Sequence, residues 1–214
     1  MKILRKVSLI VLLLCCVVSS ESKYENIAFC LNSKGEVVRK GIARNGKIFK
    51  GDVIYNGDKI IVGIDGFVAI RNIHERSEIK IFKNSSVKVF SRKNRTNGEK
   101  EFEVAILGGR VIVDKNELNN NKLIINSPSS NVFLKNSHFI INCVDEPLFD
   151  QASYCVFTSI EGNIIVENSK SKKLLFLKNG ETIISTPRGD FFQIETFRDD
   201  ENIKNSFNQI LRPF

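Results

Sequence analysis

The sequence predicts an all-β fold, arranged as a stacked β-roll, a β-solenoid or a sandwich of many short strands, with one C-terminal helix. Roughly 17 short runs rich in Val, Ile, Phe and Leu recur at intervals of about 10 residues. Glycine, asparagine, aspartate, serine or lysine bounds each run, as expected for turns between strands. A helical period occurs only near the C-terminus. The composition, 42% hydrophobic and 26% charged, is that of an ordinary globular protein.

Residues 1–20 have the pattern of an export signal. Three basic residues precede the uncharged apolar run SLIVLLLCCVV at 8–18. This run is shorter than the roughly 20 residues that a membrane-spanning helix needs, so we expect cleavage and export to the periplasm or cell envelope. Association with a membrane is expected only if the signal is retained as an anchor or lipidated at Cys15 or Cys16. Cleavage removes three positive charges and lowers the formal net charge from +8 to +5.

Residues 21–198 are expected to form one β domain. Its strand-like runs, in chain order, are NIAFCL, EVVR, KIFK, DKIIVG, GFVAIR, SEIKIF, SSVKVF, FEVAIL, RVIVD, KLIIN, NVFLK, HFIINC, CVFTSI, NIIVEN, KLLFLK, ETIIST and DFFQIETF.

A Gly-Asp pair occurs twice within GDVIYNGD, at residues 51–58. Aspartate suits turns because its carboxylate accepts hydrogen bonds from nearby backbone amides. We therefore interpret Asp52 and Asp58 as turn residues. The alternative, a catalytic carboxylate pair, requires a cleft and a perturbed environment that a sequence cannot display.

Three cysteines follow the signal: Cys30, Cys143 and Cys155. FIINCV and YCVFTSI resemble two strands joined by a turn-rich segment, so Cys143 and Cys155 are the candidates for a disulfide in an oxidising compartment. The alternative is that all three cysteines are small buried apolar residues.

Residues 199–214 are expected to form a helix packed on the β domain. Asp199 or Asp200 can cap its start, and Pro213 lies just beyond its end. Its apolar face consists of Ile203, Phe207, Ile210 and Leu211. A helix reserved for docking a partner is the alternative.

The chain also contains an internal echo. GRVIVDKNELNNNKLII, from Gly109, resembles GNIIVENSKSKKLLF, from Gly162, and the similarity continues from INSPSSNVFL (125–134) to ISTPRGDFFQI (184–194). Two similar segments indicate similar stacked β units. Chance similarity between β-rich segments is the alternative.

The order of several motifs resembles the envelope-facing domain of the FecR family. These motifs are GDVIYNGDKIIVGIDGFVAIRNIHERSEIKIFKNSSVKV, LGGRVIVD, INSPSSNVFLKNSHFIIN, SIEGNIIVEN and LKNGETI, and together they span about residues 45–185. The resemblance implies a β-rich envelope domain that interacts with other proteins.

Departures from the FecR pattern limit what the resemblance implies. Asn136 and Ser137 stand where the family commonly has Gly-Thr, and Ser127 replaces a threonine before proline. Asparagine tolerates the left-handed conformation, so the turn can persist. Only seven residues precede the apolar run, which leaves no room for the cytoplasmic segment that contacts a sigma factor in regulatory members. Sigma-factor control is therefore not expected.

No pattern in the sequence indicates an enzyme. His74 and His138 have no metal-ligand spacing, and GxSxG, P-loop and helix-opening GxGxxG motifs do not occur. We expect no catalytic activity, no metal and no cofactor.

Two basic stretches, SRKNR (91–95) and KSKK (170–173), fall in expected loops. Their candidate contacts with a polyanion are Arg92, Lys93, Arg95, Lys170, Lys172 and Lys173. Interleaved aromatic residues for stacking on bases are missing, so nucleic acid is not an expected partner. Solvated loops are the alternative interpretation.

The leading functional hypothesis is a non-catalytic, exported envelope module that binds or organises another protein, through strand edges or loops. The alternative is binding of a cell-wall polymer or polysaccharide through the basic loops.

Overall fold

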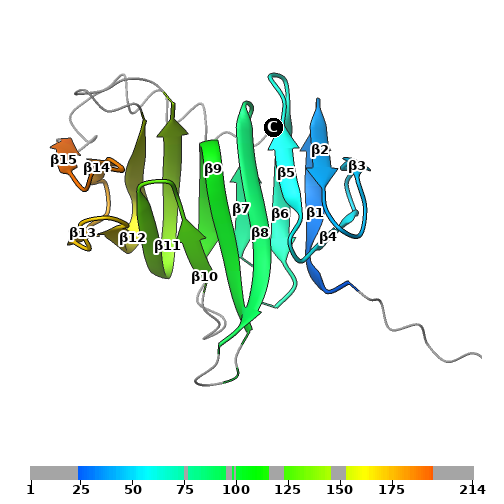
Figure 1. Cartoon of the computed structure of the whole chain (residues 1–214), viewed down its shortest axis with the longest axis horizontal. Helices are drawn as coiled ribbons and strands as arrows, with labels where there is room; N and C mark the ends of the chain where they lie inside the picture. The colour runs from blue at the N-terminus through cyan, green and yellow to red at the C-terminus, as the bar shows by residue number, and fades with distance from the viewer. Residues whose placement is uncertain are drawn as a thin grey trace, which may run out of the picture.

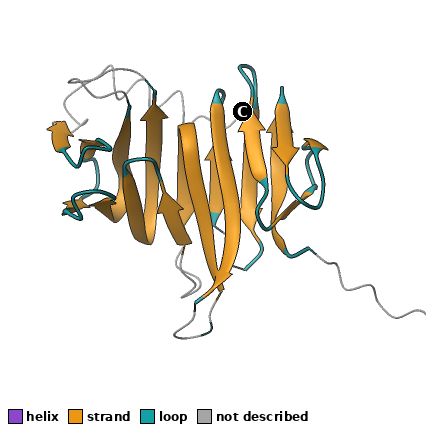
Figure 2. Ribbon diagram, viewed as in Figure 1, coloured by secondary structure: helices purple, strands orange, loops and turns teal. Residues whose placement is uncertain are grey.

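The computed structural model describes residues 24–74, 77–94, 98, 100–115, 123–145 and 153–194. Within these residues it contains fifteen strands and no helix (Figures 1 and 2), so the predicted all-β class is confirmed. The expected signal and C-terminal helix lie outside the described residues. The described part contains no helix with the length and apolarity needed to cross a membrane.

The strands follow one another closely along the chain (Figure 1). In order they are β1 (Asn26–Lys34), β2 (Val37–Lys40), β3 (Gly46–Lys47), β4 (Val53–Tyr55), β5 (Lys59–Val62), β6 (Phe67–Asn72), β7 (Glu78–Ile81), β8 (Ser85–Lys93), β9 (Lys100–Lys115), β10 (Leu123–Asn126), β11 (Ser130–Val144), β12 (Tyr154–Asn168), β13 (Leu174–Leu177), β14 (Thr182–Ser185) and β15 (Phe191–Ile194).

The strand pairings define two layers that share β9, β11 and β12. The first layer runs β4-β1-β6-β7-β9-β11-β12-β14-β15. The second runs β3-β2-β5-β8-β9-β10-β11-β12-β13. All described pairs are antiparallel except β9 with β10. β9, β10 and β11 each pair with the other two, which closes a small ring where the layers join.

The expectation of short strands was wrong at three places, where two expected strands form one long strand. β9 combines FEVAIL with RVIVD, β11 combines NVFLK with HFIINC, and β12 combines CVFTSI with NIIVEN. Gly109 in β9 and Gly162 in β12 have positive φ angles of 84° and 80°. In β11, the turn expected at Asn136 and Ser137 is instead a shift of register between Leu134 and Ser137. A bend and a turn need the same backbone freedom, so the local sequence does not distinguish them.

Each long strand contributes its two ends to different layers. Residues 100–108 of β9, for example, pair with β8 in the second layer, whereas residues 111–114 pair with β7 in the first. A Cβ atom on Gly109 would lie 2.3 Å from the Ser85 Oγ atom, which itself accepts a hydrogen bond from the Arg110 N–H at 2.9 Å. Glycine is therefore required at this bend for space as well as for φ.

Alternate side chains of both layers point into a shared core. Val87 of β8 and Val104 of β9, in the second layer, belong to the same buried cluster as Ile70 of β6 and Val111 of β9, in the first. All four are fully buried. Burial of each such side chain stabilises the fold by roughly 1.5–3 kcal/mol, so this alternation holds the layers together.

Two hairpins reproduce the internal echo of the sequence, β10–β11 and β14–β15. In each, a hydroxyl residue before proline closes the turn. The Ser127 N–H donates to the Ser130 carbonyl at 2.8 Å, and the Thr186 N–H donates to the Asp190 carbonyl at 3.0 Å. The expected similarity of the two segments is confirmed for these hairpins.

Candidate functional site

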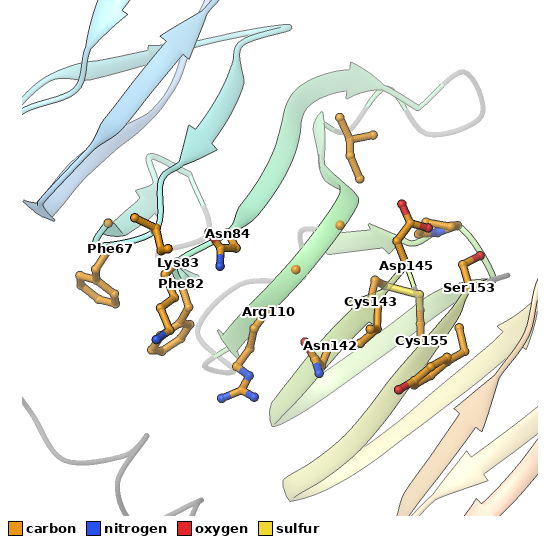
Figure 3. Close-up of a pocket in the computed structure, with 18 of the residues that line it drawn as sticks. Phe67, Phe82, Lys83, Asn84, Arg110, Asn142, Cys143, Asp145, Ser153 and Cys155 are labelled. Atoms are coloured by element: carbon orange, nitrogen blue, oxygen red, sulfur yellow. A yellow bond between two sulfur atoms is a disulfide. The ribbon is translucent and has the colours of Figure 1, made fainter. Parts of the chain in front are cut away.

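An open groove of about 840 Å³ lies beside the bend of β9 (Figure 3). The β5–β6 and β7–β8 connections line one side, the bend of β9 lies between, and the paired strands β11 and β12 line the other side. Its lining includes Ile64, Phe67, Phe82, Leu107, Arg110 and Tyr154. We call it the disulfide groove, because a disulfide forms part of its β11–β12 side.

The groove exposes apolar side chains. Ile64 is 75% exposed and Leu107 is 49% exposed. The rings of Phe67 and Phe82 pack edge to face, with centroids 5.4 Å apart and planes at 67°. Such edge-to-face pairs are favourable, so the two rings together form an apolar surface on this side of the groove. Exposed apolar side chains gathered in a groove are typical of a binding surface.

A disulfide between Cys143 and Cys155 lies on the opposite side (Figure 3). The two residues are directly opposite in the register of β11 and β12, and their Cα atoms are 4.1 Å apart. The bond therefore fixes the two strands at the edge of the groove. The remaining cysteine of the described residues, Cys30, is buried, and its thiol donates to the Asn32 carbonyl at 3.3 Å.

Charged residues surround the apolar surface. Lys83 and Arg110 lie on the lining with Asp65 and Asp145. Figure 3 shows Lys83 and Arg110 toward the Phe82 side and Asp145 beside the disulfide. In the described part of the chain, neither Lys83 nor Arg110 has an ion-pair partner. These two cations are available to an incoming anionic group.

The shifted titratable groups of the described residues lie outside the groove. No group of three or more His, Cys, Asp or Glu residues within the described ranges could hold a metal ion. Among the described residues, the pKa departs from its ordinary value at Glu25, Cys30, Asp58 and His138, and none of these four lines the groove. The lining itself offers apolar contacts and charged side chains.

The Gly-Asp pairs are turns, as predicted. Asp52 accepts a hydrogen bond from the Phe49 N–H at 3.0 Å, and Asp58 accepts one from the Tyr55 N–H at 2.9 Å. Asp58 is fully buried, and Arg39, itself only 1% exposed, lies 3.6 Å from its carboxylate. This buried pair belongs to the fold and lies outside the groove.

The two basic stretches lie at different places in the second layer. Arg92 and Lys93 end β8, whereas Lys170, Lys172 and Lys173 precede β13, with four strands between β8 and β13. Arg92 forms an ion pair with Glu103 at 2.8 Å, and Lys172 forms one with Glu167 at 3.5 Å. Arg95 lies outside the described residues. The structure therefore does not bring the two stretches into one basic patch.

His138 lies on β11, opposite Asp114 of β9 and Glu161 of β12. Burial lowers its pKa below the ordinary 6.5, although the two carboxylates act in the other direction. His74 follows β6, where its N–H donates to the Asn72 side chain at 2.7 Å.

Sequence reasoning missed the groove. Its apolar residues come from segments far apart in the chain: Ile64 lies between two strand-like runs, and Leu107 looks like an ordinary end of the run FEVAIL. The double glycine of LGGR was the available signal, because it marks the bend beside which the groove forms.

No protein-family model matches the chain, and no curated protein matches its sequence. Solved structures do match its fold. One is a candidate anti-sigma factor from Parabacteroides distasonis, with a TM-score of 0.51, 11% identity and coverage of 70% of this chain. A second crystal structure of the same description has a TM-score of 0.50, 12% identity and the same coverage.

The chain spans 63% and 64% of the lengths of those two proteins, less than two thirds in each case. At such low identity the likeness shows a shared fold alone. The class that fold and groove define is therefore an all-β domain whose fold resembles part of those proteins, with an apolar groove beside the bend of β9.

Proposed function

We propose that this chain is an exported, FecR-like, non-catalytic module that binds a segment of another envelope protein in the disulfide groove. The observation that carries the proposal is the combination of exposed Ile64 and Leu107 with the unpaired cations Lys83 and Arg110 in one groove. The order of FecR-like motifs and the fold shared with candidate anti-sigma factors support the same class of module.

The chemistry of the groove indicates its ligand. Apolar side chains of a partner would bury Ile64 and Leu107, and a neighbouring carboxylate would pair with Lys83 or Arg110. The best-fitting partner segment therefore carries an apolar anchor beside an acidic group.

The disulfide supports export. Disulfides persist in oxidising compartments and are rare in the cytosol, so Cys143–Cys155 agrees with the signal pattern of residues 1–20. Location in the periplasm or envelope is thus part of the proposal.

Site-specific photocrosslinking in intact cells tests this function. A crosslinking residue at Leu107 should capture a defined envelope protein, whereas the same residue at Ile42, which is 82% exposed and outside the groove, should not. The captured protein is then purified and its binding measured. Leu107→Asp should weaken binding at least tenfold, because a charge replaces an apolar contact. A tenfold change in affinity corresponds to about 1.4 kcal/mol. Equal capture from both positions, or unchanged affinity, would refute the groove as the site.

The polymer-binding alternative makes a different prediction. Capture of glycan alone, with binding that falls steeply as salt is added, would favour it because exposed charge contacts are screened. No specific geometry supports this alternative, because the two basic stretches are separated and two of their residues are already in ion pairs.

A further inference from the structure

Four apolar side chains form a row across neighbouring strands of the second layer. The register places Ile124 of β10 opposite Phe133 of β11, Phe133 opposite Ile165 of β12, and Ile165 opposite Phe176 of β13. We call these four residues the outer row.

The outer row points away from the core. Val132 precedes Phe133 in β11, Val166 follows Ile165 in β12, and both valines are fully buried. Successive side chains of a strand point to opposite faces, so Phe133 and Ile165 point outward. At the edge strand of the row, Phe176 is 66% exposed and Leu174 is 56% exposed. The solvent face of an antiparallel sheet usually carries polar residues, so an apolar row there indicates a covering segment.

The chain continues from β13 through β14 to β15, the last described strand. Its last residue, Ile194, is paired with Thr182 of β14, and Thr182 is only five positions after Leu177, the end of β13. Residues 195–198 can extend about 13 Å, so a segment from residue 199 begins within that reach of Ile194. A helix over residues 199–212 would be about 21 Å long, and the three strand spacings of the outer row span about 14 Å. Distance therefore allows such a helix to cover the row.

The charges are also complementary. The sequence from Asp199 begins with three successive acidic residues, whereas β13 is preceded by Lys173 and followed by Lys178, both exposed. Neither lysine has an ion-pair partner within the described residues. An acidic helix start placed at either end of β13 thus meets a lysine, and carboxylates are favourable at a helix N-terminus.

We propose that residues 199–214 fold as an amphipathic helix whose apolar face docks on the outer row and Leu174, with its acidic start against the lysines beside β13. The occupant of this surface is a segment of the same chain. The docked helix shields the apolar edge strand β13, which would otherwise offer unpaired backbone groups and exposed side chains to other molecules.

Cysteine crosslinking in the purified full chain, with Cys15 and Cys16 replaced by serine, tests the docking. A short bismaleimide is added to a Phe176→Cys/Phe207→Cys variant, and the products are resolved by mass spectrometry. The matched control is Phe176→Cys/Asn205→Cys, because residue 205 lies on the opposite side of the expected helix. The native disulfide stays intact, and Cys30 is buried.

Intramolecular crosslinking at least about tenfold faster for the Phe207 pair than for the Asn205 pair is the expected result, because docking raises the effective concentration of one face only. Equal rates would overturn the proposal. Crosslinked dimers in place of intramolecular products would assign the surface to a second copy instead. Neither outcome depends on the disulfide groove.

Discussion

Two turns six residues apart share one geometry but have different surroundings. In both, the aspartate carboxylate accepts a hydrogen bond from the N–H three residues earlier, and the preceding glycines have φ angles of 89° and 88°. Asp52 is 21% exposed and lies 3.8 Å from the exposed Arg44. Asp58 is fully buried beside Arg39, which is buried as well.

The comparison separates what a turn needs from what the fold adds. The glycine and the short acidic side chain produce the same turn twice, because both act through local backbone atoms. How much each carboxylate contributes to the stability of the protein depends on its tertiary surroundings. A screened pair such as that of Asp52 contributes little, whereas loss of one partner from a buried pair leaves an uncompensated charge.

The largest expected effect is that of Asp58→Ala. It leaves the Arg39 guanidinium buried without a carboxylate and the Tyr55 N–H without its acceptor. We expect a loss of about 3–5 kcal/mol in the free energy of unfolding, measured by urea denaturation followed by circular dichroism. The matched Asp52→Ala change should cost about 1 kcal/mol or less. Similar losses in the two variants would show that burial does not distinguish the turns.

Glycine substitutions should remove the difference between the turns. A Cβ atom at Gly51 or Gly57 meets nothing within 4 Å, so alanine adds no clash at either position. Only the left-handed backbone is penalised, by about 1–2 kcal/mol. We expect Gly51→Ala and Gly57→Ala to lower stability equally within error in the same urea assay. A much larger loss for Gly57→Ala would mean that the buried turn is also constrained by packing.

The sequence was sufficient to predict these turns because their determinants are local. It was not sufficient to predict the burial of Arg39, which sits in the run EVVRK where alternation allows either face. Burial follows from pairing of β2 with β5 and from Arg39 donating to the Val53 carbonyl, both of which depend on residues distant in the chain. An arginine in a strand is ordinarily exposed, so the residue type alone would predict an exposed side chain at Arg39.

The same distinction holds elsewhere. The disulfide candidates Cys143 and Cys155 could be named because one connection joins their strands. Bends such as that at Gly109 could not be told from turns, and those bends determine how the layers meet. The disulfide groove depends on how the layers meet, so the glycines of LGGR mark the position of the bend but do not by themselves predict the groove.

The pH dependence of the free energy of unfolding should also distinguish the Asp58 turn from the Asp52 turn, with a smaller effect than the substitutions above. Burial raises the pKa of Asp58 above its ordinary 3.8, despite the opposing effects of the Tyr55 hydrogen bond and the Arg39 charge. Just above pH 3.8 the folded state therefore binds more protons at this site than the unfolded state does. This contribution to stability is present at lower pH and is lost as pH rises through the raised pKa.

We expect urea titrations across that window to show this decline in the wild type and in Asp52→Asn. The decline should be reduced in Asp58→Asn, which cannot titrate. If Asp58→Asn keeps the full wild-type slope, another group is responsible.

The smallest expected effect concerns Cys30, whose reactivity measures opening of the turn at Gly51 and Asp52. Its N–H donates to the Asp52 carbonyl and its carbonyl accepts from the Gly51 N–H, both at 2.8 Å. Burial raises the pKa of its thiol to about 11, so iodoacetamide should not label the native chain at pH 8, whereas the denatured chain should be labelled. Asp52→Ala keeps both backbone bonds and should accelerate native-state labelling less than about tenfold, in line with a loss of about 1 kcal/mol. Acceleration above a hundredfold would mean that the exposed carboxylate, and not the backbone pairing, holds β1 in place.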